Sequence, residues 1–280
     1  MASAPPPPLS RFLARALALA ACVLATAAAA DTLVIPGAGP PEAGLRALAA
    51  AFAKASPGTQ VVVPPSTGIA GGIRAVSKGE AVLGRIARRL KDDEIRSGLK
   101  EVVIAADAVV FAVGSQVGVK TLTHAQVLDV FSGRLEDWRA LGAERGPIRV
   151  LVREPTEIAH QAIRRHVAGF EGISFAEQAK LVNADFEMIE SLDRFRTAIG
   201  WLTASSLTLS RTPVRALALE GVAPTPENVA SGRYPMAVEH VLIFKEDRLT
   251  DPARRFIAFA TSEAGREVLR AHGVIPARGR

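Results

Sequence analysis

The chain has 280 residues, of which 49% are hydrophobic and 22% are charged. This length exceeds the size at which one hydrophobic core usually keeps growing, so we expect one large domain or two medium ones. The net charge is +6 at pH 7, but the basic residues are scattered and only 5% of residues are aromatic. Because nucleic-acid surfaces combine basic patches with stacking aromatics, we expect no nucleic-acid partner.

Residues 1–30 have the features of a cleavable secretory signal. Arg11 and Arg15 precede an apolar run, and small residues stand directly before Asp31. The run is shorter than the roughly 20 residues that span a bilayer, so we expect a periplasmic mature chain without a transmembrane segment. An alternative stays open, because Leu19-Ala20-Ala21-Cys22 has the form of a lipobox and would make Cys22, the single cysteine, a lipid anchor.

The first part of the mature chain alternates predicted strands and helices. We expect strands at 33–35, 60–63, 81–86 and 101–106 from their apolar and β-branched runs. Between them we expect helices around 45–52, from the Ser66–Gly68 region to Lys78, and near 91–97. This alternation predicts βαβ units and a mostly parallel sheet with flanking helices.

The apolar strand predicted at 108–113 carries the chain into a second lobe, and a return strand is predicted at 241–244. Between and after them we expect helices at 123–130, 155–167, 252–261 and 263–271, and strands at 148–152, 199–202 and 214–219. Two extended crossings predict a two-lobed α/β fold with a two-strand hinge, of the kind that closes on a ligand. Lobe 1 is expected to comprise 31–107 and 241–280, and lobe 2 to comprise 108–240.

Enzymatic and metal signatures are missing from the sequence. It has no Gly-x-Ser-x-Gly elbow, Walker loop or His-Glu-x-x-His pair, and the histidines are dispersed. His160 and His166 stand six apart on one predicted helix, which is not the spacing of shared metal ligands, and we expect both at the surface. We therefore expect no catalysis, no cofactor and no metal.

The segment Ser66-Thr67-Gly68 lies after a predicted strand and before a predicted helix. Free backbone N–H groups and the helix dipole favour an anion there, and the two hydroxyls add donors. The alternative is a plain helix cap with a flexible turn.

Several arginines also follow predicted strands. Arg153 stands at the end of strand 148–152, where ligands bind in open α/β sheets, and arginine makes bidentate contacts to oxyanions. The alternative is a salt bridge at the surface. Arg85, Arg88 and Arg89 are placed similarly after the third strand, and at least one of them is expected to be only solvated.

A series of motifs in order resembles a known family. The pieces are Ile35-Pro36-Gly37-Ala38-Gly39, the stretch from Pro65 to Ile73, Gly79 to Gly84 with Ala87-Arg88-Arg89-Leu90, the stretch from Phe131 to Gly142 with its Phe-x-Gly-x-x-x-x-Trp pattern, Arg153-Glu154, Ile199-Gly200-Trp201, Arg233-Tyr234-Pro235-Met236 and the closing segment from Phe256 to Pro276. Together they resemble the phosphate-type solute-binding proteins of ABC importers, which have the type II periplasmic-binding fold.

The resemblance implies a ligand site made of loop amides, hydroxyls and arginine. The residues that it carries over, together with those above, are Ala38, Gly39, Ser66, Thr67, Gly68, Arg88, Arg153 and Thr156. It also implies a phosphate-like oxyanion as ligand and an ABC permease as partner, and we expect a monomer.

Departures from the family pattern fall on this site. Pro40-Pro41 replaces the usual Ser or Thr after the first loop, and Val82 stands where members carry an Asp. Thr156-Glu157-Ile158 replaces the Ser-Gly-Thr that usually follows the arginine, and a carboxylate at Glu157 facing the cleft would repel a dianion.

From the resemblance, the first hypothesis is an importer component for phosphate or another small oxyanion. The alternatives are an interaction or sensor module that has lost tight anion binding, and an enzyme, for which the sequence offers no support beyond the versatility of the fold.

Overall fold

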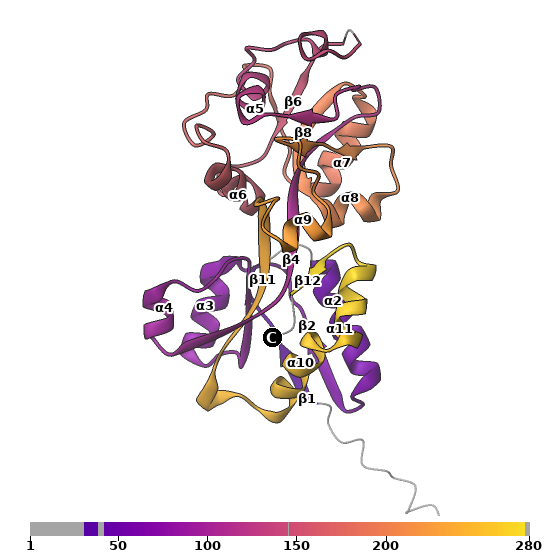
Figure 1. Ribbon diagram of the computed structural model, residues 1–280. Coiled ribbons are helices and arrows are strands. Elements are labelled where there is room, and N and C mark those ends of the chain that lie inside the picture. The colour runs from indigo at the N-terminus through magenta and orange to yellow at the C-terminus, as the bar shows by residue number, and fades with distance from the viewer. Residues whose placement is uncertain (1–30, 39–41, 145, 278–280) are drawn as a thin grey trace, which may run out of the picture.

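The computed structural model describes residues 31–38, 42–144 and 146–277, so the predicted signal peptide, Cys22 and Gly39 lie outside the described residues. The chain forms two lobes joined by two long strands (Figure 1). None of the described helices is long and apolar enough to cross a membrane.

Both lobes combine strands with flanking helices. Lobe 1 contains β1 (Asp31–Val34), α2 (Glu42–Ala55), β2 (Thr59–Val62), α3 (Gly68–Lys78), β3 (Leu83–Ile86), α4 (Asp92–Arg96), α10 (Asp251–Thr261), α11 (Glu263–Ala271) and β12 (Ile275–Pro276). Lobe 2 contains β5 (Thr121–Leu122), α5 (His124–Phe131), β6 (Arg149–Val152), α6 (Ile158–His166), β7 (Lys180–Leu181), α7 (Asp185–Arg194), β8 (Ala198–Thr203), α8 (Ala204–Ser210), β9 (Arg215–Ala216), β10 (Ala218–Leu219) and α9 (Pro226–Ala230). The two long strands are β4 (Leu99–Val113) and β11 (Ala237–Lys245).

The strand β4 belongs to both lobes. Its first part pairs antiparallel with β11 in lobe 1, and its last part, Val109 to Val113, pairs antiparallel with β8 in lobe 2. The two strands expected at 101–106 and 108–113 are therefore one continuous strand. Asp107 between them does not interrupt the strand because Ser205 hydrogen-bonds its carboxylate.

The strand registers place the carboxyl ends of both sheets next to the hinge. In lobe 1, Ile86 at the end of β3 pairs with Val241 of β11, and β1 runs parallel to β3 and β2. In lobe 2, Thr203 at the end of β8 pairs with Val109 of β4, and β6 runs parallel to β8. The loops after β1, β2, β3 and β6 therefore lie at the junction of the lobes, where ligands bind in open α/β folds.

Each lobe has its own core. In lobe 2 the buried rings of Phe131 and Phe170 pack edge-on against Trp201, at centroid distances of 5.3 and 5.7 Å. In lobe 1, Phe52 of α2 packs edge-on against Phe256 of α10 at 5.3 Å. Such aromatic pairs bury large apolar areas, and here they join α5 to β8 in lobe 2 and α2 to α10 in lobe 1.

The buried apolar residues divide between the lobes without mixing. One cluster draws on residues 108–238, and the other two draw on residues 33–105 and 241–274. We retain the proposed lobes, 31–107 with 241–280 and 108–240, on this basis.

Some elements differ from the sequence expectations. The sheets are mixed rather than mostly parallel, because the hinge strands run antiparallel to β3, β8 and β12. The strand expected at 214–219 is divided between β9, which pairs with β4, and β10, which pairs with β5. Helices α7, α8 and α9 were not predicted. α8 and α9 have only 7 and 5 residues and bury no apolar side chain, whereas α7 has 10 residues and a buried apolar face that the sequence analysis missed.

Candidate functional site

The loop after β1 is bound to the end of β3 by backbone hydrogen bonds. The Arg85 N–H donates to the Pro36 carbonyl (2.9 Å), and the Ala38 N–H donates to the Arg85 carbonyl (3.0 Å). Gly37 has a φ of 132°, and a Cβ there would lie 1.9 Å from the Arg85 carbonyl oxygen, so the close approach requires glycine. Ala38 is buried and its N–H is used within lobe 1, while Gly39 lies outside the described residues.

The loop after β2 presents two hydroxyls at the start of α3. The Thr67 N–H donates to the Gly37 carbonyl (3.0 Å), which joins the first two loops. The Gly68 N–H donates to Ser66 Oγ (3.3 Å). Thr67 makes no side-chain capping bond to α3, and all three predicted residues of this loop are exposed. The start of α3 and the Thr67 hydroxyl are therefore accessible to an anion from solvent.

The arginines after β3 are held within lobe 1. Arg88 makes two hydrogen bonds of 2.8 Å to the Glu94 carboxylate, which raise the pKa of Arg88 and lower that of Glu94 to about 2. Burial of Arg88 opposes this rise of its pKa. Arg89 pairs with Glu101 at 2.8 Å. Arg85 is buried and donates to a carbonyl in the loop after β2. The Arg88 guanidinium thus contacts α4 rather than the first two loops. The expectation that at least one of the three arginines is only solvated is wrong, because each has a protein partner.

Arg153 is a buried cation at the end of β6. Its side chain is 7% exposed, and Nη1 donates to Asp185 Oδ1 at 2.6 Å. Nη2 donates to the Asn183 carbonyl at 3.2 Å. Among the described residues, Nε has no hydrogen-bond partner. One edge of the guanidinium is therefore anchored to the start of α7, and Nε keeps an unused donor in a buried position.

Glu157 caps the N-terminus of α6. Its carboxylate accepts hydrogen bonds from the N–H groups of Ala159 (3.0 Å) and His160 (2.9 Å). Its Oε1 also lies 3.9 Å from Nη2 of Arg153. The carboxylate therefore occupies the position between arginine and helix amides that would suit an external oxyanion.

The helix α6 begins at Ile158, and the expected start at Pro155 is wrong. The chain makes a turn instead, in which the Glu157 N–H donates to the Glu154 carbonyl (3.0 Å). Thr156 lies exposed on this turn, and its carbonyl accepts from Gln161 Nε2 at 3.1 Å. Glu157 is the better cap because its carboxylate reaches two amides of the first turn.

Asp107 lies fully buried in the hinge strand β4. Its carboxylate accepts from the Ser205 N–H (3.1 Å) and from Ser205 Oγ (2.5 Å). Burial raises the pKa of Asp107 to about 7, and the nearby charge of Asp185 adds to the rise, while the Ser205 and Thr203 hydrogen bonds oppose it. The hinge therefore contains a carboxyl group that titrates near neutral pH.

Thr203 and Ser205 connect this hinge carboxyl to the arginine. Thr203 Oγ1 donates to Asp185 Oδ2 at 2.8 Å and lies 3.5 Å from Ser205 Oγ. The Thr203 N–H donates to the same Asp185 oxygen at 3.2 Å. Asp185 also holds Arg153, so one set of hydrogen bonds joins Thr203 to Arg153 and another joins Ser205 to Asp107. The two sets are only in contact, because each hydroxyl has already donated its one proton to a carboxylate.

Five of the predicted site residues form two groups, whereas Arg88 is paired with Glu94 and the Ala38 N–H is bonded within lobe 1. Ser66, Thr67 and Gly68 gather at the start of α3 in lobe 1, and Arg153 and Thr156 lie near the start of α6 in lobe 2. Both helices lie on the same side of the hinge strands in Figure 1. Sequence reasoning missed the residues that hold Arg153 and join it to the hinge, which are Asp107, Asp185, Thr203 and Ser205. One signal was available, because Asp107 is the single polar residue between Val102 and Val113.

The histidines do not form a metal site within the described residues. His160 is 3% exposed, which corrects the expectation of a surface position. Its ring packs edge-on against Trp201 and Phe170, at 5.2 and 5.6 Å. No group of three or more potential ligands occurs in the part of the chain that the structure describes.

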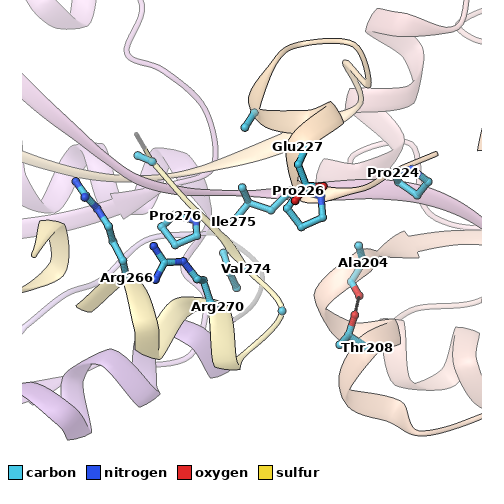
Figure 2. A pocket seen from close by; sticks show the side chains of 13 residues that line it. Ala204, Thr208, Pro224, Pro226, Glu227, Arg266, Arg270, Val274, Ile275 and Pro276 are labelled. Carbon is cyan, nitrogen blue, oxygen red and sulfur yellow. Dashed lines mark hydrogen bonds between the residues drawn. The ribbon is translucent and has the colours of Figure 1, made fainter. Parts of the chain in front are cut away.

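A cavity lies on the side of the hinge strands away from the loops after β1, β2 and β3. It has a volume of about 740 Å³, and its walls come from α8, α9, α11 and the segment around β12 (Figure 2). β12 and β11 both pair with β4 at Ala106, so they occupy opposite edges of that strand. The hinge strands therefore separate this cavity from the loops after β1, β2 and β3.

Comparison with known proteins gives consistent matches. A family model described as a PBP superfamily domain matches residues 23–264. The phosphate-binding protein PstS of Bacillus subtilis (strain 168) is 26% identical over 254 residues, which cover 89% of this chain and 81% of that protein. The phosphate-binding protein PstS of Borreliella burgdorferi is 21% identical over 195 residues, covering 68% of this chain and 70% of that protein.

Solved structures show the same fold. A phosphate ABC transporter substrate-binding protein from Clostridium perfringens, crystallised with bound phosphate, has a TM-score of 0.75 and 27% identity, covering 89% of this chain and all of that one (100%). An ABC-type phosphate transport receptor from Vibrio cholerae has a TM-score of 0.68 at 23% identity, covering 87% and 99% of the two chains, and shows the fold alone. The two-lobed α/β fold expected from the sequence is confirmed.

The buried carboxyl in the hinge predicts a pH dependence. Because the folded protein keeps the Asp107 proton up to about pH 7, whereas the unfolded chain releases it near 3.8, deprotonation favours unfolding between these values. We expect Asp107→Asn to gain stability relative to the wild type as pH rises through this window, by up to about 1.4 kcal/mol per pH unit, and to gain no more above it. Urea unfolding at a series of pH values measures the difference; a constant difference would contradict the prediction.

Proposed function

Because this chain belongs to the PBP superfamily, we propose that it is the solute-binding component of an ABC importer, binding phosphate or a related small oxyanion between its lobes. The resemblance to phosphate-type solute-binding proteins is confirmed by the comparisons. The observation that carries the proposal for the ligand is Arg153, a buried guanidinium beside the N-terminus of α6 with an unused Nε donor. Arginine at a helix N-terminus is suited to oxyanions because both supply donors and positive potential.

The opposite wall of the proposed site is the start of α3. Ser66 and Thr67 are exposed there, and Thr67 has a hydroxyl that does not cap the helix. A ligand held by hydroxyls and amides of lobe 1 and by Arg153 of lobe 2 would favour the conformation in which the lobes are closest, because only that conformation offers both sets of contacts. We therefore propose capture by lobe closure about β4 and β11, without chemical conversion of the ligand.

Location and partner follow from the same proposal. A signal peptide cleaved before Asp31 would release the protein to the periplasm, and a lipid on Cys22 would tether it there instead. The delivery step would require an ABC permease that recognises the loaded protein. We propose a monomer, because one chain supplies both walls of the site.

One observation favours a second candidate, a periplasmic sensor or interaction module that keeps the fold without tight anion binding. The Glu157 carboxylate already accepts the α6 amide bonds that an oxyanion would need. A module of this kind would leave the anion position permanently filled by the protein itself.

Ligand-dependent stabilisation separates the two candidates. A ligand at about 100 times its Kd stabilises the folded state by roughly 2.7 kcal/mol, which raises the Tm of a protein of this size by about 5–10 °C. For an importer component we expect such a shift with phosphate, sulfate, molybdate or a small carboxylate in a thermal-unfolding panel. If none of them changes the Tm at millimolar concentration, the oxyanion proposal fails.

Arg153→Lys tests the arginine within its ion pair. Lysine keeps a positive charge beside Asp185, so the fold retains its buried pair, but it lacks the planar fork that binds an oxyanion bidentately. We expect the Kd of the oxyanion identified by the panel to rise at least about tenfold by calorimetry. Arg164→Lys, at a more exposed position on α6, is the matched control and should leave the Kd unchanged. Equal affinities for both variants would remove Arg153 from the site.

The cavity behind the hinge allows a test of lobe closure. If the lobes move apart on the side of the candidate site, they move together on the opposite side of the hinge strands, where this cavity lies. A large side chain in the cavity should therefore oppose the opening of the candidate site. We expect Thr208→Trp, which projects from α8 into the cavity, to lower the Kd of the bound oxyanion by about three- to tenfold. Leu209→Trp places the same side chain on the neighbouring exposed position outside the lining and should have no effect. A Kd for Thr208→Trp at or above the wild-type value would argue against closure about this hinge.

A further inference from the structure

The positive charge of Arg153 is already more than balanced by carboxylates without a ligand. Asp185 lies 2.6 Å from Nη1, and Glu157 lies 3.9 Å from Nη2. One guanidinium therefore faces two carboxylates. An oxyanion that approached the same position would add a further negative charge to a site with low exposure, where repulsion is poorly screened.

The two carboxylates differ in how firmly they are held. Asp185 is fixed by Arg153 and by two donors of Thr203, at 2.8 and 3.2 Å. Glu157 is held at its carboxylate by the amides of Ala159 and His160 and by the longer contact to Arg153. Its side chain is 19% exposed, so a rotation about its own dihedral angles can carry the carboxylate to solvent. Asp185 thus holds the arginine in place, and Glu157 is the carboxylate that can move away from it.

We propose that Glu157 is a built-in competitor for the oxyanion and sets the affinity and selectivity of the site. In the ligand-free protein its carboxylate accepts hydrogen bonds from two amides of α6 and lies next to Nη2 of Arg153. An oxyanion can bind these donors only by displacing the carboxylate. This inference rests on the proposed function, because it assigns the competitor for the same lobe 2 donors.

Because a ligand must displace the Glu157 carboxylate, the site should favour anions with several acceptor oxygens. The incoming anion must replace two amide hydrogen bonds and one ionic contact that the protein already makes, so an anion with one weak acceptor gains little. A tetrahedral oxyanion has enough oxygens to bond the two amides, Nη2 and Nε of Arg153 at once. Because Nε has no partner in the described structure, it is the donor that Glu157 does not satisfy and that gives the ligand an advantage over the internal carboxylate.

Substitution of Glu157 tests the competition while keeping the helix capped. Serine is a good N-cap, so Glu157→Ser retains a hydrogen bond to the first turn of α6 and removes the charge. We expect Glu157→Ser to bind inorganic phosphate at least about tenfold more tightly than the wild type in calorimetric titrations, because the competing carboxylate is gone. Glu157→Asp keeps a charged cap and should stay within about threefold of the wild type.

A matched control separates direct competition from general electrostatics. Glu154 lies three residues earlier on the same exposed turn, and Glu154→Ser removes the same charge without freeing the α6 amides. We expect its phosphate Kd to stay within about twofold of the wild type, because exposed charges are well screened. Circular dichroism and thermal unfolding verify that each variant is folded.

The outcomes distinguish this inference from the proposed function. Tighter phosphate binding by Glu157→Ser but not by Glu154→Ser supports the competitor, even if the wild type binds no oxyanion and the importer proposal fails. If the wild type binds phosphate and Glu157→Ser binds it equally or more weakly, the competitor is refuted and the proposed function stands. If neither protein binds phosphate or any oxyanion of the panel, both are refuted.

Discussion

The structure depends on one strand that belongs to two sheets. β4 pairs with β11 in lobe 1 and with β8 in lobe 2, so the lobes are joined by continuous backbone rather than by a loose linker. The registers on either side then determine that the strands of both lobes end at the junction. The loops at those ends therefore face the same space, and five of the predicted site residues lie there, near the N-termini of α3 and α6.

The same strand contains a buried carboxyl group, which lowers the stability of the fold unless it is hydrogen-bonded. Asp107 is fully buried where an apolar residue would pack without penalty, and burial of a carboxyl group requires a partner. Ser205 supplies it, and Thr203 and Asp185 extend the polar contacts to Arg153. The hinge carboxyl and the arginine of the candidate ligand site are thus held by two neighbouring residues at the start of α8, whose hydroxyls lie 3.5 Å apart.

The sequence allowed the prediction of features that depend on near neighbours. Runs such as Val61-Val62-Val63 and Val109 to Val113 indicated strands, and the order of motifs indicated the fold. The features that could not be predicted depend on contacts between residues that are distant in the chain. Ser205 stands 98 residues from Asp107, and Asp185 stands 32 residues from Arg153, so no local pattern could connect them. His160 looked like a surface residue because the aromatic rings around it come from other segments.

Glu157 shows how a local rule can be correct and still mislead. A proline near a helix start predicted that α6 begins at Pro155, yet the chain turns once more and uses the glutamate as its cap. That choice places a carboxylate where Arg153 and the helix amides converge. Helix capping and anion binding draw on the same N–H groups, so a residue selected to satisfy one necessarily competes with the other. At this site the Glu157 carboxylate and an external oxyanion would therefore compete for the same donors.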